Sequence, residues 1–534
     1  MEKENLRQNN IIWNLAVRDD EYVAKHVKDN KEMDAIYSLK EAGLLDEFFQ
    51  FLQEMNIIEL IKEVKYKDVQ REMVEFFQYI FLYICKIILG IKSQNSLPDL
   101  LFSNTAAMGL VGFNAYQVKN GICNRGDDKR KTKEKQGPIC PPTLSNNIVK
   151  IPKEEVEKLL NKAISKIAEN KLLPERILAI LDTTDIETTE KFKGAKSVTR
   201  KKRIKDKSGK EKEVEITVWG FKLLALYHYQ TKIPLAAKLI NINEQGNKYT
   251  QEILKIAKDN LGNNCKIKCV VMDREFLDGE DLWELHKEDI HFVVPAKTNM
   301  QVFEDAKILA FKEGREEDIR VIESRIREVS VGKGKNKKIE KKETILAGIK
   351  GLISFDQYGP KGNYKNRYKK SFTPRILNAV VVLTWDGDDY GKKGGPVYLT
   401  DLPVDNPFLA FDYYDERSCI ENSLFREGKQ KWYFKKPPKR NEEGIITHIF
   451  LTLFVLSLTS AYWGWKRTQE DEKELLGIER WRMRLKRENQ EKVIVFVEKK
   501  YGIFYNYEVI ILSGARVKDF DENKIFEKYN IRAP

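Results

Sequence analysis

Two aspartates stand directly after apolar segments, where their carboxylates could take part in chemistry. Asp182 ends the run RILAILD at 176–182, and Asp273 ends the run KIKCVVMD at 266–273. The carboxyl end of a strand opens onto the edge of a sheet, where an acid can face solvent and substrate. If the two strands are neighbours in one sheet, these acids converge. Asp185 is the local alternative to Asp182, further out along the chain.

Two neighbouring carboxylates favour a particular kind of metal chemistry. They repel each other unless a proton or a cation neutralises them. Oxygen ligands with no Cys or His nearby favour Mg²⁺ or Mn²⁺ over zinc. A pair of such ions can activate an attacking oxygen and stabilise a leaving oxygen. Either aspartate alone is explained as well by a strand end or a helix cap, so the hypothesis rests on the pair.

A third carboxylate falls on a helix that we expect to begin near Tyr413. Tyr414, Arg417 and Glu421 follow one another at i, i+3 and i+7, which places them on one stripe of that helix. Glu421 could complete the metal site, while Arg417 could bind DNA phosphate. The alternative is an ordinary surface ion pair, because Arg and Glu four residues apart often pair on helices.

A longer pattern around these residues resembles a known family. The run YDERSCIENSLFREGKQKW at 414–432 resembles the Y-R-E-K signature of DDE transposases of the insertion-sequence-four type. The runs ILDTTD and VVMDREF resemble the first and second catalytic Asp motifs of that family, and VYLTDLP resembles the run before its last catalytic helix. The resemblance covers about 176–465. It implies that Asp182, Asp273 and Glu421 form a catalytic triad that holds two Mg²⁺ ions, for which Mn²⁺ can substitute.

The signature departs from its simplest form at the lysine. That form places Lys seven residues after the Glu, where this chain has Gly428, and Lys429 follows one residue later. Lys429 therefore lies further round a regular helix, although its long side chain could still reach a phosphate. The resemblance implies that Tyr414, Arg417 and Lys429 contact DNA.

Trp385 is a further candidate for DNA contact. It closes the apolar run RILNAVVVLTW at 375–385, just before a turn rich in Gly and Asp. A large aromatic side chain at a strand end could wedge against an unstacked base. Transposases that resemble this chain use an aromatic residue of such an insertion when their DNA ends form hairpins. The ordinary alternative is that Trp385 packs the insertion against the core.

The charge of the chain indicates a polyanionic partner. Lys and Arg number 94 against 81 Asp and Glu, which gives a formal net charge of +13 and a pI near 9.0. Any one basic segment is typical of a solvated loop, but several around one core predict a path for DNA. The basic segments are 196–210, 333–338, 365–370 and 435–440, with the aromatic residues Tyr364, Tyr368, Trp432 and Tyr433 close to them.

Cysteine usage and targeting signals indicate the compartment. Six cysteines form neither a convincing zinc spacing nor a disulfide framework, which is typical of a reducing environment. The first ten residues lack the apolar run of a secretory signal. The apolar segment 445–465 is long enough to cross a bilayer, but we interpret it as a buried core helix. We expect a cytoplasmic, nucleoid-associated protein with no membrane partner.

At 534 residues, the chain is too long for a single hydrophobic core. We expect an α/β ribonuclease-H-like catalytic core that is interrupted by an all-β insertion and preceded by a helical region. The expected parts are a helical N-terminal region for DNA-end binding at 1–150, the core in two parts at 151–300 and 406–470, the β-rich insertion at 301–405, and a C-terminal region at 471–534 as a candidate for dimerisation.

The expected function is metal-dependent cleavage and strand transfer of DNA. The resemblance implies cut-and-paste transposition of an insertion sequence through hairpin ends. The partners would be double-stranded transposon ends and target DNA, bound by a homodimer because two ends need two active sites. One alternative is a catalytically retired, transposase-derived DNA-binding protein. Another is a stand-alone endonuclease of the same fold, which would cut DNA without joining it.

Overall fold

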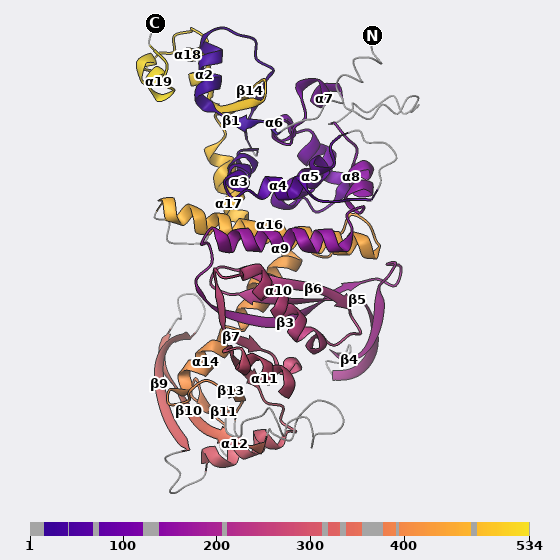
Figure 1. Cartoon of the computed structure of the whole chain (residues 1–534), viewed down its shortest axis with the longest axis vertical. Coiled ribbons are helices and arrows are strands. Elements are labelled where there is room, and N and C mark those ends of the chain that lie inside the picture. Colours follow the sequence, from indigo (N-terminus) through magenta and orange to yellow (C-terminus); the bar gives the residue numbers. More distant parts are fainter. Residues whose placement is uncertain are drawn as a thin grey trace. The chain divides into compact units, whose positions relative to one another are not determined.

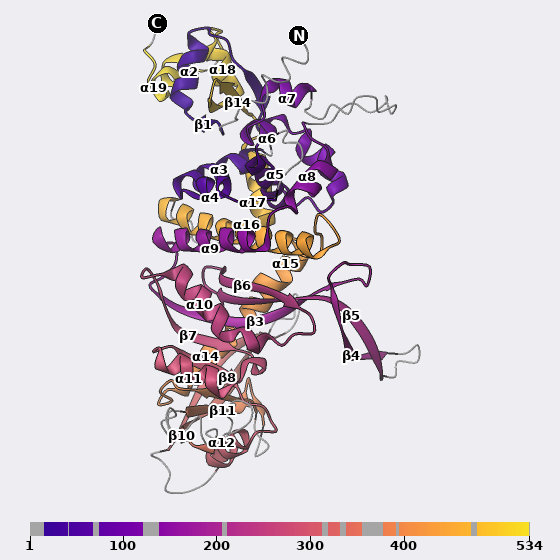
Figure 2. The same cartoon turned by 45° about the vertical axis from the view of Figure 1, so that its right-hand side comes forward.

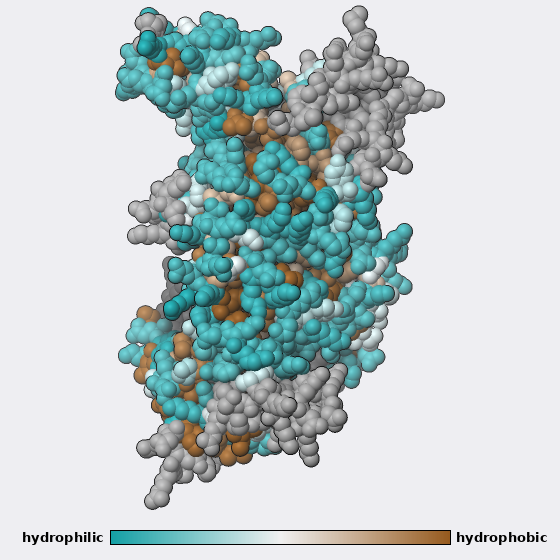
Figure 3. Space-filling model, in the orientation of Figure 1, coloured by the Kyte–Doolittle hydropathy of each residue, from teal (hydrophilic) through white to brown (hydrophobic). Residues whose placement is uncertain are grey.

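The chain divides into two compact units in its computed structural model. The first unit contains residues 1–172, 191–194 and 429–534, and the second contains residues 173–190 and 195–428. The structure describes residues 15–40, 42–67, 74–120, 138–205, 211–311, 319–331, 338–354, 377–390, 395–470, 478–518 and 520–532. Charged residues make up 33% of the chain, and hydrophilic residues cover most of the face shown in Figure 3.

One large sheet organises the second unit (Figure 1). The order of its strands is β4-β5-β3-β7-β8-β13-β11-β10-β9, and β6 and β12 pair with β5 and β11. The strands are β3 (Arg176–Thr188), β4 (Lys196–Lys205), β5 (Glu211–His228), β6 (Ile233–Asn241), β7 (Lys266–Met272), β8 (His291–Pro295), β9 (Arg320–Val331), β10 (Lys338–Leu352), β11 (Leu377–Trp385), β12 (Asp388–Asp389) and β13 (Val397–Thr400).

The middle of this sheet combines antiparallel and parallel pairing. Strands β3, β5 and β6 form an antiparallel meander, and β7 and β8 run parallel to β3. The run Cys269–Met272 of β7 is buried, as expected for a central strand covered on both faces. Parallel strands end at the same edge of a sheet, so the residues that follow β7 emerge beside those of β3.

The predicted insertion does not form a separate all-β body. Strand β13 pairs antiparallel with β8, so the strands of 301–405 continue the central sheet. The region also begins with helix α12 (Gln301–Phe311), so it is β-rich but not all-β. The buried residues of α12 recur at helical spacing, from Val302 to Ala306 and Ala310, and this period identifies it as a helix.

The first basic segment, predicted as a loop, is largely a strand. Strand β4 pairs with β5 from Lys196↔Gly220 to Lys205↔Glu211, and Figure 2 shows this hairpin extending away from the other strands of the sheet. Opposite charges face each other across the pair, since Lys201 lies opposite Glu215 and 3.6 Å from the carboxylate of Glu213. Such cross-strand pairs stabilise an otherwise polar hairpin.

Short helices connect the strands of the second unit, namely α10 (Thr250–Leu261), α11 (Gly279–Lys287), α12 and α14 (Pro407–Asp415). The helix predicted near Tyr413 begins earlier, because Asn406 caps it and Pro407 takes its first position. It also does not continue regularly. A π-helix, η9 (Ile420–Arg426), follows α14 and leads into α15 (Glu427–Gln430).

The first unit is mainly helical. Its helices include α2 (Asp20–Lys28), α3 (Ala42–Glu54), α4 (Ile57–Lys62), α5 (Phe76–Ile88), α6 (Thr105–Leu110), α7 (Ala115–Asn120), α8 (Pro141–Ile148), α9 (Lys153–Glu169), α16 (Glu442–Glu470), α17 (Ile478–Glu488), α18 (Asn506–Leu512) and α19 (Glu522–Lys528). Helix α16 is long and apolar enough to cross a membrane, but 94% of its most apolar window is buried, which favours the core-helix interpretation. It packs against α9 and α5.

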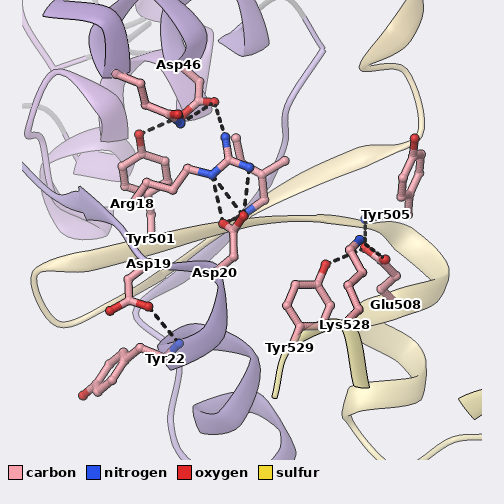
Figure 4. A network of polar contacts seen from close by, with 12 residues as sticks. Arg18, Asp19, Asp20, Tyr22, Asp46, Tyr501, Tyr505, Glu508, Lys528 and Tyr529 are labelled. Carbon is pink, nitrogen blue, oxygen red and sulfur yellow. Dashed lines mark hydrogen bonds and ion pairs between the residues drawn. The ribbon is translucent and has the colours of Figure 1, made fainter. Parts of the chain in front are cut away.

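A small sheet joins the two ends of the chain within the first unit. Its order is β1 (Val17–Arg18), β15 (Lys500–Tyr505), β14 (Lys492–Val497) and β2 (Ala35–Ser38). Figure 4 shows the polar contacts beside it: the buried carboxylate of Asp46 accepts hydrogen bonds from Arg18 at 2.9 Å and from the Tyr501 hydroxyl at 2.7 Å. The regions predicted at 1–150 and 471–534 therefore share one folded unit.

Candidate active site

Asp182 and Asp273 lie level with each other on neighbouring parallel strands. The pairing of β3 with β7 ends at Leu181↔Met272, and each acid is the next residue along the chain. Asp273 then begins the short helix η4 (Arg274–Phe276), so the backbone turns away from the sheet at this point. The sequence pattern that predicted two acids at one sheet edge thus corresponds to two adjacent positions in the fold.

Strand β3 itself does not end at Asp182, contrary to the sequence-based expectation. It continues to Thr188, because β5 pairs with it from Ala179↔His228 to Thr188↔Trp219. Asp182 lies at an open edge only on the side of β3 that faces β7, because β7 ends at Met272. On the other side of β3, β5 continues to pair with it. Asp185 lies three residues further along β3 and pairs with Arg200 of the β4–β5 hairpin.

Arg417 joins the first and third predicted acids. Its Nη1 donates a hydrogen bond to Oδ2 of Asp182 at 2.7 Å, and its Nη2 lies 2.9 Å from Oε1 of Glu421. The pair with Glu421 is the ion pair between residues four apart on a helix that the sequence also allowed. The contact with Asp182, however, spans 235 positions of the sequence and is not local. Tyr414 lies beside this arginine, with its ring centroid 5.7 Å from the guanidinium carbon. It also packs against Tyr398 at a centroid distance of 4.4 Å.

The environment of Asp182 opposes its ionisation. Burial is the main cause, since the residue is only 7% exposed, and it raises the pKa of Asp182 to about 7. The guanidinium of Arg417 and the Thr183 amide, which donates to Oδ1 at 2.7 Å, both oppose this rise in pKa. The negative charges of Asp273 and Glu421 add to the rise. The three acids are therefore close enough to interact electrostatically, and together they favour a bound cation.

The residues fit a divalent cation in their chemistry. All three acids offer hard oxygen ligands, which Mg²⁺ and Mn²⁺ prefer. Among the residues that the structure describes, no three His, Cys, Asp or Glu side chains are already gathered closely enough to hold an ion, because Arg417 lies between Asp182 and Glu421. The side chain of Glu421 is 54% exposed, so it can turn toward the aspartates without disturbing the core.

Glu275 is a supporting residue that the sequence analysis did not single out, although it lies in the DREF run. Its carboxylate accepts hydrogen bonds from the Thr183 hydroxyl at 3.2 Å and from the Gly246 amide at 3.0 Å. A Cβ on Gly246 would lie 2.7 Å from Cγ2 of Thr183, so only glycine fits this close approach. Through these hydrogen bonds Glu275, which follows Asp273, connects the loop after β6 to Thr183, which follows Asp182.

A second supporting contact holds the π-helix that carries Glu421. The hydroxyl of Tyr227 on β5 lies 2.8 Å from the hydroxyl of Ser423 on η9. Burial raises the pKa of Tyr227 above its usual value, so its hydroxyl stays protonated at neutral pH. No sequence signal marked these two residues, because their contact depends on how η9 packs on the sheet.

Trp385 packs against α14. It is half-buried, and its ring lies edge-on to that of Phe411 at a centroid distance of 5.3 Å. This contact favours the packing alternative, and the base-wedge role stays a prediction. Lys429 lies in α15, within the first unit, and its role in phosphate binding also stays a prediction.

The other basic and aromatic candidates have mixed outcomes. Trp432, which the sequence places beside a basic segment, is 5% exposed, so its ring is packed inside the protein and is not available to stack on bases in this conformation. The segment 365–370 and most of 333–338 lie outside the described residues, as do Tyr364 and Tyr368. Tyr433 lies in the first unit, where the ammonium of Lys92 is 5.2 Å from its ring centroid.

Comparisons with known proteins give a family and matches to solved structures. The family model described as "Transposase DDE domain" matches residues 173–458. No curated protein matches the chain. One of these solved structures is a cryo-EM structure of the piggyBac transposase synaptic complex with hairpin DNA. It is 11% identical, with a TM-score of 0.38, over 91% of this chain and 82% of that one.

Proposed function

The chain belongs to the DDE transposase family, and we propose that it catalyses metal-dependent cleavage and strand transfer of DNA in cut-and-paste transposition. One observation carries the proposal beyond the family assignment. Asp182 and Asp273 follow paired positions of two parallel strands, and Arg417 joins Asp182 to Glu421. Two acids that are distant in the sequence are thus neighbours at a sheet edge, and Arg417 links the third acid to the first, which supports a DDE site that Glu421 would complete by turning toward the aspartates.

Transposases of this family use divalent metal ions, and we assign Asp182, Asp273 and Glu421 as the residues that would hold two Mg²⁺ or Mn²⁺ ions. Bound ions supply activation of the attacking oxygen and neutralisation of the leaving oxygen. The chain itself supplies the geometry. Strands β3 and β7 fix the two aspartates, while the hydrogen bond between Tyr227 and Ser423 holds the segment that presents Glu421.

Bound cations would neutralise the carboxylates that Arg417 now contacts. Its guanidinium could then bind substrate phosphate. A guanidinium can bind phosphate through two parallel hydrogen bonds, which orients the phosphate as well as attracting it. Tyr414 and Tyr398 limit where this side chain can move, because their rings are packed beside it. We assign Arg417 and Tyr414 to DNA binding for this reason.

Lys429 is the third proposed DNA ligand near Glu421. The sequence places it one residue later than the simplest signature does. The π-helix η9 contains Glu421 and continues to Arg426, before Lys429, and a π-helical turn takes up one extra residue relative to an α-helix. This extra residue offsets the displacement of Lys429 and supports its assignment as the signature lysine.

The finer parts of the proposal follow from the resemblance and from the needs of the reaction. We interpret the meander β3-β5-β6 with the parallel strands β7 and β8 as a ribonuclease-H-like core. Two element ends need two active sites, so we propose a homodimer on paired double-stranded ends of an insertion sequence, acting in the cytoplasm at the nucleoid. Second-strand cleavage through a hairpin, with Trp385 against a displaced base, is the proposed route.

Two other functions make different predictions in one assay. A catalytically retired DNA-binding protein would bind DNA and leave it unchanged, and a stand-alone endonuclease would cut it without joining. The assay incubates the full chain with Mg²⁺ and duplex DNA carrying the inverted repeats that flank the coding region, together with a target duplex. Joined products support the transposase. Cut products alone, or bound and unchanged DNA, would contradict it.

A further inference from the structure

Helix α17 (Ile478–Glu488) carries a dense set of positive charges in the first unit. Its sequence is IERWRMRLKRE, in which five residues are Lys or Arg and two are Glu. Trp481 is 1% exposed and packs edge-on against Phe48 of α3 at a centroid distance of 6.5 Å. The tryptophan therefore fixes which side of α17 faces the protein and leaves the opposite side at the surface.

One of the arginines serves the fold. Arg482 donates a hydrogen bond to the carbonyl oxygen of Ile87 at 3.0 Å and another to that of Ile88, at the C-terminal end of α5. The Ile87 carbonyl also accepts from the Gly90 amide at 3.0 Å, and the guanidinium adds a side-chain cap to this end of α5. Burial lowers the pKa of Arg482 to about 10, but it remains charged at neutral pH.

Three other arginines share one side of the helix, which flanks the face that buries Trp481. Arg480, Arg484 and Arg487 follow at i, i+4 and i+7, which places them on one stripe, and Met483 within that stripe is 66% exposed. Arg484 pairs with Glu488 at 2.8 Å, where both side chains are exposed. Arg480 and Arg487 are exposed and make no ion pair with any residue in the described part of the chain. We call this stripe the arginine face of α17.

We propose that the arginine face of α17 binds the phosphate backbone of duplex DNA; this inference rests on the proposed function. From Arg480 to Arg487 the helix rises about 10.5 Å, and the phosphates of one strand of a duplex follow at about 3.4 Å along the duplex axis. A helix lying along the backbone could thus place each of the three guanidinium groups at a phosphate. Contacts of this kind position a protein on DNA and carry no sequence information.

The arrangement of α17 favours DNA over a membrane surface. A helix that lies in a membrane interface needs a broad apolar face turned to the lipid. Trp481, the largest apolar residue of α17, is instead buried in the protein, and the exposed Met483 lies among arginines. The net charge of +13 adds a long-range attraction for a polyanion. An acidic surface on a protein, including a second copy of this chain, remains as an outcome for the test.

The test measures binding of the full chain to a duplex of arbitrary sequence between about 50 and 200 mM salt. In the variant Arg480→Ala/Arg484→Ala/Arg487→Ala, the slope of log affinity against log salt should decrease in magnitude by about 2.7, because each lost phosphate contact removes about 0.9. The affinity near 150 mM salt should fall on the order of 10²-fold. The same three positions changed to Lys should keep most of the slope, since the charge is retained.

A matched control removes the same net charge from another helix of the first unit. The lysines are Lys158, Lys162 and Lys166 of α9, each of which already pairs with a glutamate. Their replacement by Ala should change the salt slope far less than the arginine variant does. Equal changes in the two variants, or an unchanged slope in the arginine variant, would overturn the proposal.

Two further outcomes separate this inference from the proposed function. If the arginine variant binds DNA with the parent slope, cuts it normally, and sediments as a smaller species, the arginine face is a protein interface and the inference alone fails. If the parent chain binds duplex DNA but neither cuts nor joins it, the proposed function fails while the arginine face stands. Circular dichroism establishes that each variant is folded, and the Lys variant serves as the comparison if the Ala variant is not.

Discussion

Replacing Asp182 by Asn should stabilise the metal-free protein, because the native fold holds this carboxyl in an environment that opposes its charge. Its pKa rises from the ordinary value of 3.8 to about 7, mainly through burial. Ionised Asp182 therefore costs the fold about 4 kcal/mol at pH 8, at 1.36 kcal/mol for each pH unit between the two values. An amide would accept a weaker hydrogen bond from Thr183, at a cost of about 1 kcal/mol. The expected net gain is about 3 kcal/mol.

The sign of the pH dependence follows from the same pKa. A carboxyl whose pKa is raised in the folded state contributes stability when it is protonated. That stability is fully present below about pH 4 and is lost as the pH rises through about 7. Near pH 4 the Asp182→Asn variant should accordingly be about 1 kcal/mol less stable than the parent, because only the weaker hydrogen bond remains, and its relative stability should rise until about pH 7. Above that pH it should stay constant.

The assay follows hydrogen exchange of peptides from β3 and β7 in the full chain, with a chelator present, between pH 5 and pH 8. These peptides report the second unit separately from the first. Asp185→Asn is the matched control, because Asp185 pairs with Arg200 and no gain is expected there. An Asp182→Asn variant that is no more stable than the parent at pH 8, or whose advantage does not change with pH, would refute the reasoning.

Substitutions at four other positions test neighbouring contacts. Arg417→Ala should reduce the magnitude of the salt slope of DNA binding by about 0.9, because one phosphate contact is lost. Arg417→Lys should keep the slope but lower the rate of strand transfer. An unchanged slope in the Ala variant would mean that Arg417 contacts only the acids. Trp385→Ala should lower the unfolding free energy by roughly 2 kcal/mol, because it removes the contact with Phe411. If the folded Trp385→Ala variant also accumulates nicked DNA in place of hairpins, the base-wedge role is supported, and normal hairpin formation would exclude it. Ser423→Ala should slow DNA cleavage while DNA affinity stays constant, because it releases η9 from Tyr227, and Tyr227→Phe combined with it should have no additional effect.

The acids were predictable because their signal is local. An apolar run that ends in Asp identifies a strand and its edge without reference to the rest of the chain, and this held for the level placement of Asp182 and Asp273. The continuation of β3 to Thr188 was missed, because the polar run after Asp182 forms a strand only through its pairing with β5. Tertiary pairing of this kind overrides local propensity.

The contacts of the site depend on packing that no local pattern encodes. The stripe of Tyr414, Arg417 and Glu421 was visible in the sequence, but the contact of Arg417 with Asp182 needs the fold. The π-helix η9 has no composition of its own, since it differs from an α-helix only in its hydrogen-bond pattern. The shared sheet of the two chain ends likewise pairs β2 with β14 across most of the sequence.

The central claim is that Asp182, Asp273 and Glu421 perform DNA strand transfer as one metal-dependent site. The most direct measurement is joining of 3′-OH DNA ends to a target duplex by Asp182→Asn, Asp273→Asn and Glu421→Gln, each with Mg²⁺, beside Asp185→Asn as a control. The account predicts joined product from the parent chain and from Asp185→Asn, and none from the other three, which should still bind DNA. Normal joining by any of those three would contradict it.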